Sequence, residues 1–250
     1  MKLSLGLFLY LVSFSLLSKE TDEDSTRAVK KERQSKSTLN TRLHTMGQFS
    51  FSGRIISPNP ALDFMYTYDR KQWGGTFFKA FDLYDHTTTN NFALAMVRKN
   101  FQAGKRLTIT PQVGFILEQS FSVADKGSDL ASFIINSYKV SNSLSIEYTL
   151  VFFNLALYTK DRDWINRLRL LYSKNHWDVI LLAWHNNKVI DYDNSVYFSS
   201  GINIFYSRIK VSDHLFLSAG LSGLVMAYTT KPNEYPKNNG LFLTVAGFIH

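Results

Sequence analysis

Residues 107–117 carry the clearest hydrophobic pattern of the chain, an alternation of apolar and polar positions with a period of two. The odd positions are Leu, Ile, Pro, Val, Phe and Leu, whereas the even positions from 108 to 114 are Thr, Thr, Gln and Gly. Residues 144–152 alternate in the same way, with Leu, Ile, Tyr, Leu and Phe at the even positions. Successive side chains of a β-strand point to opposite faces, so this period predicts strands with one apolar and one polar face.

The same pattern recurs along the chain from Gly47 to the C-terminus. We predict an all-β fold of about twelve strands, each near the length that crosses a bilayer at the tilt of a barrel. Pro111 interrupts the pattern, because a closed barrel has no free edge where a missing backbone N–H goes unnoticed, and we expect a bulge there. The predicted strands begin near Gly47, Leu62, Thr76, Phe92, Leu107, Leu130, Leu144, Trp164, Trp177, Tyr197, Leu215 and Leu241.

The connections between the predicted strands separate a membrane barrel from a soluble sandwich, which shows the same alternation. Short connections occur at 103–105, 141–143, 173–176 and 211–214, and longer ones at 119–129, 186–195 and 229–240. Tight turns at one end and longer loops at the other are typical of transmembrane barrels with both termini in the periplasm. Aromatic residues also cluster near strand ends, as the girdles of such barrels require. These are Tyr66, Tyr68, Trp73, Tyr84, Trp164, Trp177 and Trp184.

On these features, residues 46–250 resemble a Gram-negative outer-membrane β-barrel of the smaller, roughly twelve-stranded kind. The resemblance implies a closed antiparallel up-and-down barrel in the bacterial outer membrane. It also implies insertion by the outer-membrane assembly machinery and contact with membrane lipid and lipopolysaccharide. In such proteins the last strand usually ends in an aromatic residue. Phe248 is close to that position, whereas His250 departs from the pattern.

Two segments precede the predicted barrel. Residues 1–18 begin with Lys2 and continue as an apolar run, which predicts a signal peptide cleaved after Ser15 or Ser18. The alternative is an uncleaved membrane anchor, although the run is shorter than a bilayer span. Residues 19–45 are mostly charged or small polar residues, so we predict a disordered periplasmic tail. A tail that folds back to plug the lumen is the alternative.

Composition supports the β assignment and excludes several other classes of protein. Aromatic residues make up 15% of the chain, which suits pleated surfaces, and a mean hydropathy of −0.13 is too polar for a bundle of membrane helices. The net charge of +8 is not accompanied by a basic helix, a zinc spacing or an aromatic RNA-binding motif, so no nucleic-acid partner is predicted. The absence of cysteine excludes disulfides, a thiolate nucleophile and a lipoprotein anchor.

The strand assignment also predicts which polar residues face the lumen, where charges must be paired or hydrated. If residue numbers sum to about 320 across the 158–163 loop, Arg167 and Arg169 face Phe153 and Val151 and not Glu147. The next turn then places His185 beside Arg167. The candidate lumen residues are Arg54, Asp63, Gln112, Glu118, Glu147, Arg167, Arg169 and His185.

An arginine and histidine cluster in the lumen indicates a narrow passive pore that favours small anions, because rings of basic residues line anion pores. Two alternatives stay open. One is a hydrated polar interior that fills the barrel, and the other is a structural or partner-binding subunit of an envelope complex. Basic residues of the longer loops are candidates for contact with glycolipid phosphate. These are Lys160, Arg162, Lys188, Lys231 and Lys237.

An outer-membrane hydrolase is the weakest of the candidate functions. Phospholipases and lipid A deacylases of this class resemble one another in a His-x-Ser motif, but Asn186 and Asn187 follow His185, so the nucleophile is missing. The omptin-like proteases use paired acids and an Asp-His couple, and spacing alone does not establish such a couple here. The corresponding residues near the outer rim are Asp82, Asp85, His86, Asp191 and Asp193. We therefore predict no catalytic residue, no metal and no cofactor.

Overall fold

The computed structural model describes residues 35–49, 53–85, 92–118, 129–153, 162–190, 193–233, 237 and 239–249. The predicted signal peptide and residues 19–34 of the predicted tail lie outside this range. No helix among the described residues is long and apolar enough to cross a membrane. The strands are β1 (Lys36–His44), β2 (Gly47–Phe49), β3 (Arg54–Ser57), β4 (Ala61–Arg70), β5 (Trp73–Asp82), β6 (Phe92–Lys99), β7 (Phe101–Ala103), β8 (Leu107–Glu118), β9 (Asp129–Lys139), β10 (Leu144–Phe153), β11 (Arg162–Lys174), β12 (Trp177–Ile190), β13 (Asp193–Lys210), β14 (Leu215–Thr229) and β15 (Gly240–Ile249).

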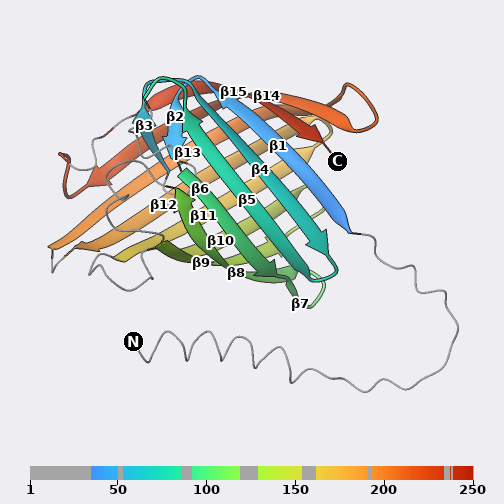
Figure 1. Cartoon of the computed structure of the whole chain (residues 1–250), viewed down its shortest axis with the longest axis horizontal. Helices are drawn as coiled ribbons and strands as arrows, with labels where there is room; N and C mark the ends of the chain where they lie inside the picture. The colour runs from blue at the N-terminus through green and yellow to red at the C-terminus, as the bar shows by residue number, and fades with distance from the viewer. Residues whose placement is uncertain are drawn as a thin grey trace, which may run out of the picture. The chain divides into compact units, whose positions relative to one another are not determined.

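The barrel wall consists of twelve antiparallel lines, each of which is one strand or, for β6 and β7, two consecutive strands (Figure 1). The alternating pattern predicted this closed arrangement. Neighbours follow chain order from β8 to β15, after which β15 pairs with β1 and β1 pairs with β4. The ring closes because β6 and β7 form two halves of one line, and both pair with β8. The remaining strands, β2 and β3, pair only with each other.

The first strand of the barrel corrects the predicted tail, because residues 36–44 form β1 between β4 and β15. This segment has little apolar content, which predicted disorder. A barrel strand needs apolar residues only on its outward face, and Leu39 and Leu43 supply them, while the inward positions include Arg42 and His44. The strand predicted at Gly47 is also wrong, because β2 and β3 form a short hairpin that is not part of the barrel wall. The strand count is right because these two errors offset each other.

Two further details of the prediction are corrected. No bulge occurs at Pro111, whose pairing with Ile134 of β9 is continuous. On the other side of β8, the neighbouring strand is interrupted at Asn100, between β6 and β7. The register of the pairing with β8 is the same before and after this interruption. The missing N–H of Pro111 is therefore accommodated by an interruption of one ladder. The predicted loop at 186–195 is mostly strand, because β12 and β13 pair as far as Ile190 and Asp193.

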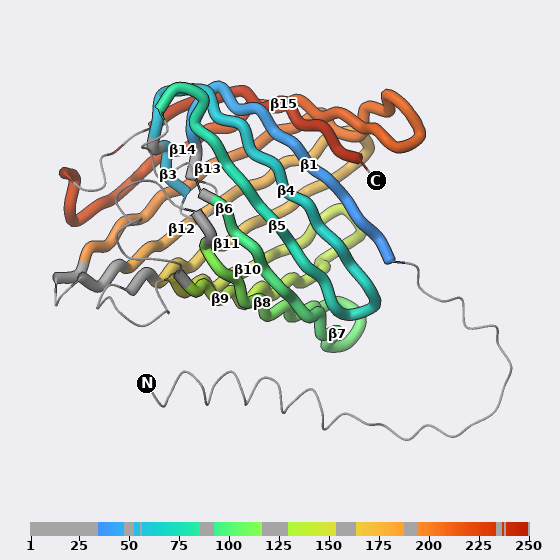
Figure 2. The backbone as a smooth tube through the Cα atoms, in the orientation of Figure 1, coloured from blue at the N-terminus to red at the C-terminus, as the bar shows by residue number. Residues whose placement is uncertain are grey.

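The two ends of the barrel differ in their connections. The turn end carries the short connections at 71–72, 104–106, 140–143, 175–176 and 211–214, together with the start of β1 and the end of β15 (Figure 2). The opposite ends of the strands form the loop end, where the β2–β3 hairpin lies between β1 and β4 in the sequence. The outward face is apolar and accessible, with Leu241 71% exposed and Val245 52% exposed on β15. Such a continuous apolar band is a liability in water and fits a lipid surrounding.

Candidate functional site: the barrel lumen

The accessibility of the inward side chains falls from the turn end to the loop end. On β1 the inward residues change from exposed at Lys36 through partly buried at Arg42 to buried at His44. On β4 the inward residues change from partly buried at Asp69 to buried at Asp63 and Ala61. Solvent therefore reaches the lumen from the turn end and is excluded toward the loop end.

A cluster of buried apolar side chains occupies the loop-end half of the lumen. It draws inward residues from nine of the twelve lines of the barrel, and none of its members is more than 7% exposed. A water-filled channel would leave its lining accessible, so the lumen is packed at this level. Small barrels commonly fill their interior with side chains in this way. The apolar cluster consists of Ile55, Phe78, Ala80, Leu94, Ile116, Ala131, Phe133, Val151, Phe153, Ile165, Trp184, Leu224 and Phe242.

The β2–β3 hairpin contributes Ile55 to the apolar cluster and contacts the wall through two glycines. At Gly53, with φ of +64°, an added Cβ would lie 2.2 Å from Trp184 Cδ2. At Gly240 of β15, an added Cβ would lie 2.8 Å from Ile55 Cδ1. Only glycine allows these approaches of backbone to side chain. The hairpin therefore lies inside the barrel, in contact with both β12 and β15.

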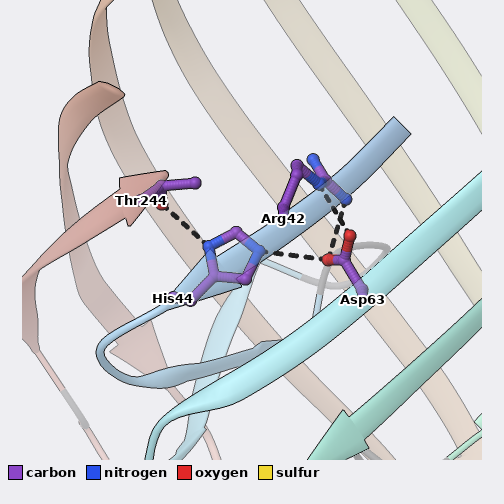
Figure 3. A network of polar contacts seen from close by, with 4 residues as sticks. All are labelled: Arg42, His44, Asp63 and Thr244. Atoms are coloured by element: carbon purple, nitrogen blue, oxygen red, sulfur yellow. Dashed lines mark hydrogen bonds and ion pairs between the residues drawn. The ribbon is translucent and has the colours of Figure 1, made fainter. Parts of the chain in front are cut away.

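A polar network of three charged or titratable side chains, on β1 and β4, lies beside the apolar cluster (Figure 3), with Asp63 directly opposite Ala80 in the register. Arg42 donates from Nε to Asp63 Oδ1 at 2.8 Å and from Nη2 to Asp63 Oδ2 at 2.9 Å, a bidentate pair. His44 Nε2 donates to Asp63 Oδ2 at 3.1 Å, and His44 Nδ1 is hydrogen-bonded to Thr244 Oγ1 at 2.8 Å. The network joins β4, β1 and β15, so it stabilises the closure of the barrel.

A second charged cluster lies across β10 and β11. Glu147 pairs directly with Arg169 in the register, and its Oε1 accepts from Arg169 Nε at 2.8 Å and from Arg167 Nη2 at 3.3 Å. Arg167 also donates to Thr149 Oγ1 at 3.2 Å. One carboxylate is thus shared by two guanidinium groups, so the cluster keeps one excess positive charge.

A third ion pair lies near the turn end. Arg98 Nη2 donates to both carboxylate oxygens of Asp69, at 2.7 and 2.8 Å, and Arg98 Nη1 donates to Thr76 Oγ1 at 3.1 Å. The three clusters together hold four arginines against three acids, Asp63, Asp69 and Glu147.

The structure places most predicted lumen residues inward but changes their partners. Arg167 and Arg169 face Thr149 and Glu147, four residues from the predicted partners, so the predicted separation from Glu147 is wrong. His185 is also wrongly placed, because Arg167 pairs with Trp184 and His185 pairs with Asn166 on the outward face. A register error of one residue moves a side chain to the other face of the wall.

The other predicted lumen residues occupy different surroundings. Gln112 is buried on β8 opposite Arg98. Arg54 belongs to the hairpin, with its Cζ 5.4 Å from the centre of the Tyr197 ring. Glu118 ends β8, and its side chain lies outside the described part of the structure. Arg42 and His44 were missed because they lie in the segment predicted as tail, although Leu39 and Leu43 show the alternation that marks a strand.

The candidate catalytic residues form no described acid-base couple. Asp82 Oδ1 accepts from the backbone N–H groups of Tyr84 and Asp85, both at 2.9 Å, and therefore caps the turn after β5. His86 and Asp191 lie outside the described residues, and for Asp193 only the backbone is described. The described residues contain no group of His, Asp and Glu that could hold a metal ion.

Comparison with known proteins agrees with this architecture. No protein-family model and no curated protein matches the sequence. The solved NanC porin is similar to this chain with a TM-score of 0.57 and 11% sequence identity, over 85% of this chain and 99% of that chain. The KdgM porin, solved in complex with disordered oligogalacturonate, has a TM-score of 0.54 and 7% identity, over 85% of this chain and 98% of that chain. The chain therefore has the fold of small outer-membrane β-barrels.

Proposed function

We propose that this chain is an outer-membrane pore for small solutes, and that the β2–β3 hairpin closes its lumen at the loop end. The observation that carries the proposal is the insertion of Ile55 and Gly53 between the walls at Gly240 and Trp184. The turn end of the lumen admits solvent, so the barrier to passage lies at the level of the hairpin and the apolar cluster.

The way the hairpin is held makes it a movable element. Its two strands pair with each other and with no described barrel strand, so its exit breaks no ladder hydrogen bonds of the wall. Side-chain contacts hold it in place: Ile55 is 5% exposed, Arg54 lies over the Tyr197 ring, and the Ser57 and Asn59 side chains are hydrogen-bonded to Asp82 of β5. Burial of the Ile55 side chain alone contributes roughly 1.5–3 kcal/mol, and the polar contacts add to it, so the open state is a minor population.

The charges of the lumen favour anions. The three inward ion-paired clusters leave one excess positive charge, carried by the Arg167 and Arg169 pair around Glu147. In a narrow passage that partly excludes water, one excess charge acts through a lower effective dielectric constant than it would on the surface. We further propose that the turn end faces the periplasm, which is the orientation of short turns in bacterial barrels.

The hairpin can be removed cleanly because His44 and Ala61 are direct partners at the ends of β1 and β4. Replacement of residues 45–60 by Asn-Gly would join these strands through a two-residue turn. We expect low conductance from the wild-type protein in a planar bilayer and a larger, steady conductance from the Asn-Gly variant.

A reversible lock supplies the opposite perturbation. The chain contains no cysteine, so Ile55→Cys with Gly240→Cys introduces only one possible disulfide, at a place where a Cβ added to Gly240 would lie 2.8 Å from Ile55 Cδ1, an atom that the Ile55→Cys change removes. Oxidation should abolish the residual wild-type openings and reduction should restore them, while each single variant should not respond.

A structural or partner-binding barrel is the second candidate, favoured by the apolar cluster, most of which belongs to the wall. The two candidates differ in the Asn-Gly variant. If that variant folds as a heat-modifiable barrel and does not conduct, the pore proposal is refuted and the wall alone fills the lumen.

A further inference from the structure

Basic residues gather at the turn end of the barrel. The segments at 36, 69–73, 98–106, 139–143, 174–178 and 208–214 hold eleven Lys and Arg residues and three Asp residues. The basic residues are Lys36, Arg70, Lys71, Arg98, Lys99, Lys105, Arg106, Lys139, Lys174, Arg208 and Lys210.

All three acids of this end already have partners. Asp69 pairs with Arg98 at 2.7 Å. Asp178 pairs with Arg208 at 3.2 Å, and Asp213 pairs with Lys210 at 2.7 Å. Eight of the eleven basic residues therefore have no acidic partner among the described residues, so this end of the barrel carries a local excess of positive charge that attracts anions.

Four of the residues near this end form an outward row with aromatic rings between the charges. In the register, Arg70 of β4 pairs with Trp73 of β5, which pairs with Lys99 of β6. Lys99 Nζ lies 5.2 Å from the centre of the Trp73 ring and 4.9 Å from the centre of the Phe101 ring. Lys71 adds a further charge in the adjacent tight turn, where its φ is +56°. We call Arg70, Lys71, Trp73, Lys99 and Phe101 the basic-aromatic row.

The aromatic rings show the depth of this row in a bilayer. Trp73 is 52% exposed and Phe101 is 45% exposed, both beside the apolar band of the wall. Aromatic residues at strand ends mark the boundary between hydrocarbon and headgroups. Cations directly beside them therefore lie at the depth of the lipid phosphates.

We propose that the basic-aromatic row binds the phosphate of an anionic glycerophospholipid in the leaflet at the turn end. The Arg70 guanidinium offers paired donors that match two phosphate oxygens, and Lys71 and Lys99 add point charges. The Trp73 and Phe101 rings contact the glycerol and upper acyl region. This site is separate from the lumen and does not depend on the pore proposal.

The test uses the full chain in dodecyl maltoside and measures the temperature at which the folded band is lost on gels. Added phosphatidylglycerol should raise this temperature by several degrees, because a ligand that binds only the folded state stabilises it. Phosphatidylcholine should raise it less, and 0.5 M NaCl should weaken the phosphatidylglycerol effect. Equal effects of the two lipids would overturn the proposal.

Two triple variants separate the row from the general charge of this end. Arg70→Gln, Lys71→Gln and Lys99→Gln together should reduce the apparent affinity for phosphatidylglycerol at least tenfold. The control, Lys36→Gln with Arg106→Gln and Lys139→Gln, removes the same charge at the same end and should bind like the wild type. Equal losses in both variants would refute the row as the site. A comparable shift with inorganic phosphate alone would identify a free-anion site and overturn the lipid assignment.

Discussion

Replacement of Glu147 by leucine tests how far water reaches the charged cluster around Glu147 in the lumen. Glu147 is 11% exposed in its side chain, and it contacts Arg167 and Arg169, which are 14% and 25% exposed. Glu147→Leu removes the only acid of this cluster among the described residues and leaves two adjacent guanidinium groups without a counter-charge.

The size of the effect depends on how much water reaches the cluster. Two unit charges about 4 Å apart attract by about 4 kcal/mol at an effective dielectric constant near 20, and by about 1 kcal/mol in bulk water. The low exposure of Arg167 favours the first value. We therefore expect Glu147→Leu to lower the free energy of unfolding by about 3–5 kcal/mol, as for other buried pairs that lose one partner.

Equilibrium unfolding in urea, in lipid vesicles and followed by tryptophan fluorescence, measures this free energy. The matched control is the triple variant Glu147→Leu, Arg167→Met and Arg169→Met, in which no charge is left unpaired. It should recover most of the loss, since apolar replacement of a whole buried ion cluster is often neutral or stabilising. A loss below about 1 kcal/mol in Glu147→Leu alone would show that the cluster is fully hydrated and refute the partial exclusion of water at this level.

Two further predictions concern the register and the first strand. In the Asn-Gly variant, Arg167→Glu with Arg169→Glu should move the reversal potential toward cation preference. The control His185→Glu changes the outward face and should leave the reversal potential unchanged. Equal shifts of the reversal potential would refute the observed register. Deletion of residues 36–44 should abolish the heat-modifiable band, because it leaves β4 and β15 unpaired, while deletion of residues 19–34 should preserve the band. Folded protein after the first deletion would contradict the position of β1.

The presence of a strand, and which of its side chains point inward, were predictable from the sequence wherever the outward face is strongly apolar. Leu107, Leu144, Trp177 and Leu215 begin both predicted and observed strands. The strand at residues 36–44 was not predicted, because only Leu39 and Leu43 are large and apolar on its outward face. Their polar neighbours have the composition of a disordered segment. The pairing of β1 with β4 and β15 supplies the stability that its own composition does not.

Register was less predictable than facing, and the two register errors had different consequences. The prediction for β10 and β11 was wrong by four residues: it correctly placed Arg167 and Arg169 inward, but it put them too far from Glu147 along the barrel axis. An error of one residue between β11 and β12 moved His185 from the lumen to the outside. Loop length sets the register, and a sequence does not show how far each strand continues into a loop.

The proposed gate depends on the hairpin being an element separate from the barrel wall. A twelve-stranded barrel lies between the filled small barrels and the open channels of about sixteen strands, so large wall side chains alone can fill much of its lumen. Here the last part of the space is filled by a separate element that has no ladder hydrogen bonds to the wall. Gly53 and Gly240 allow close contact, so the fit is specific. Because side-chain contacts alone join the described hairpin strands to the wall, the hairpin can leave the lumen without breaking a ladder, which supports the proposed gate.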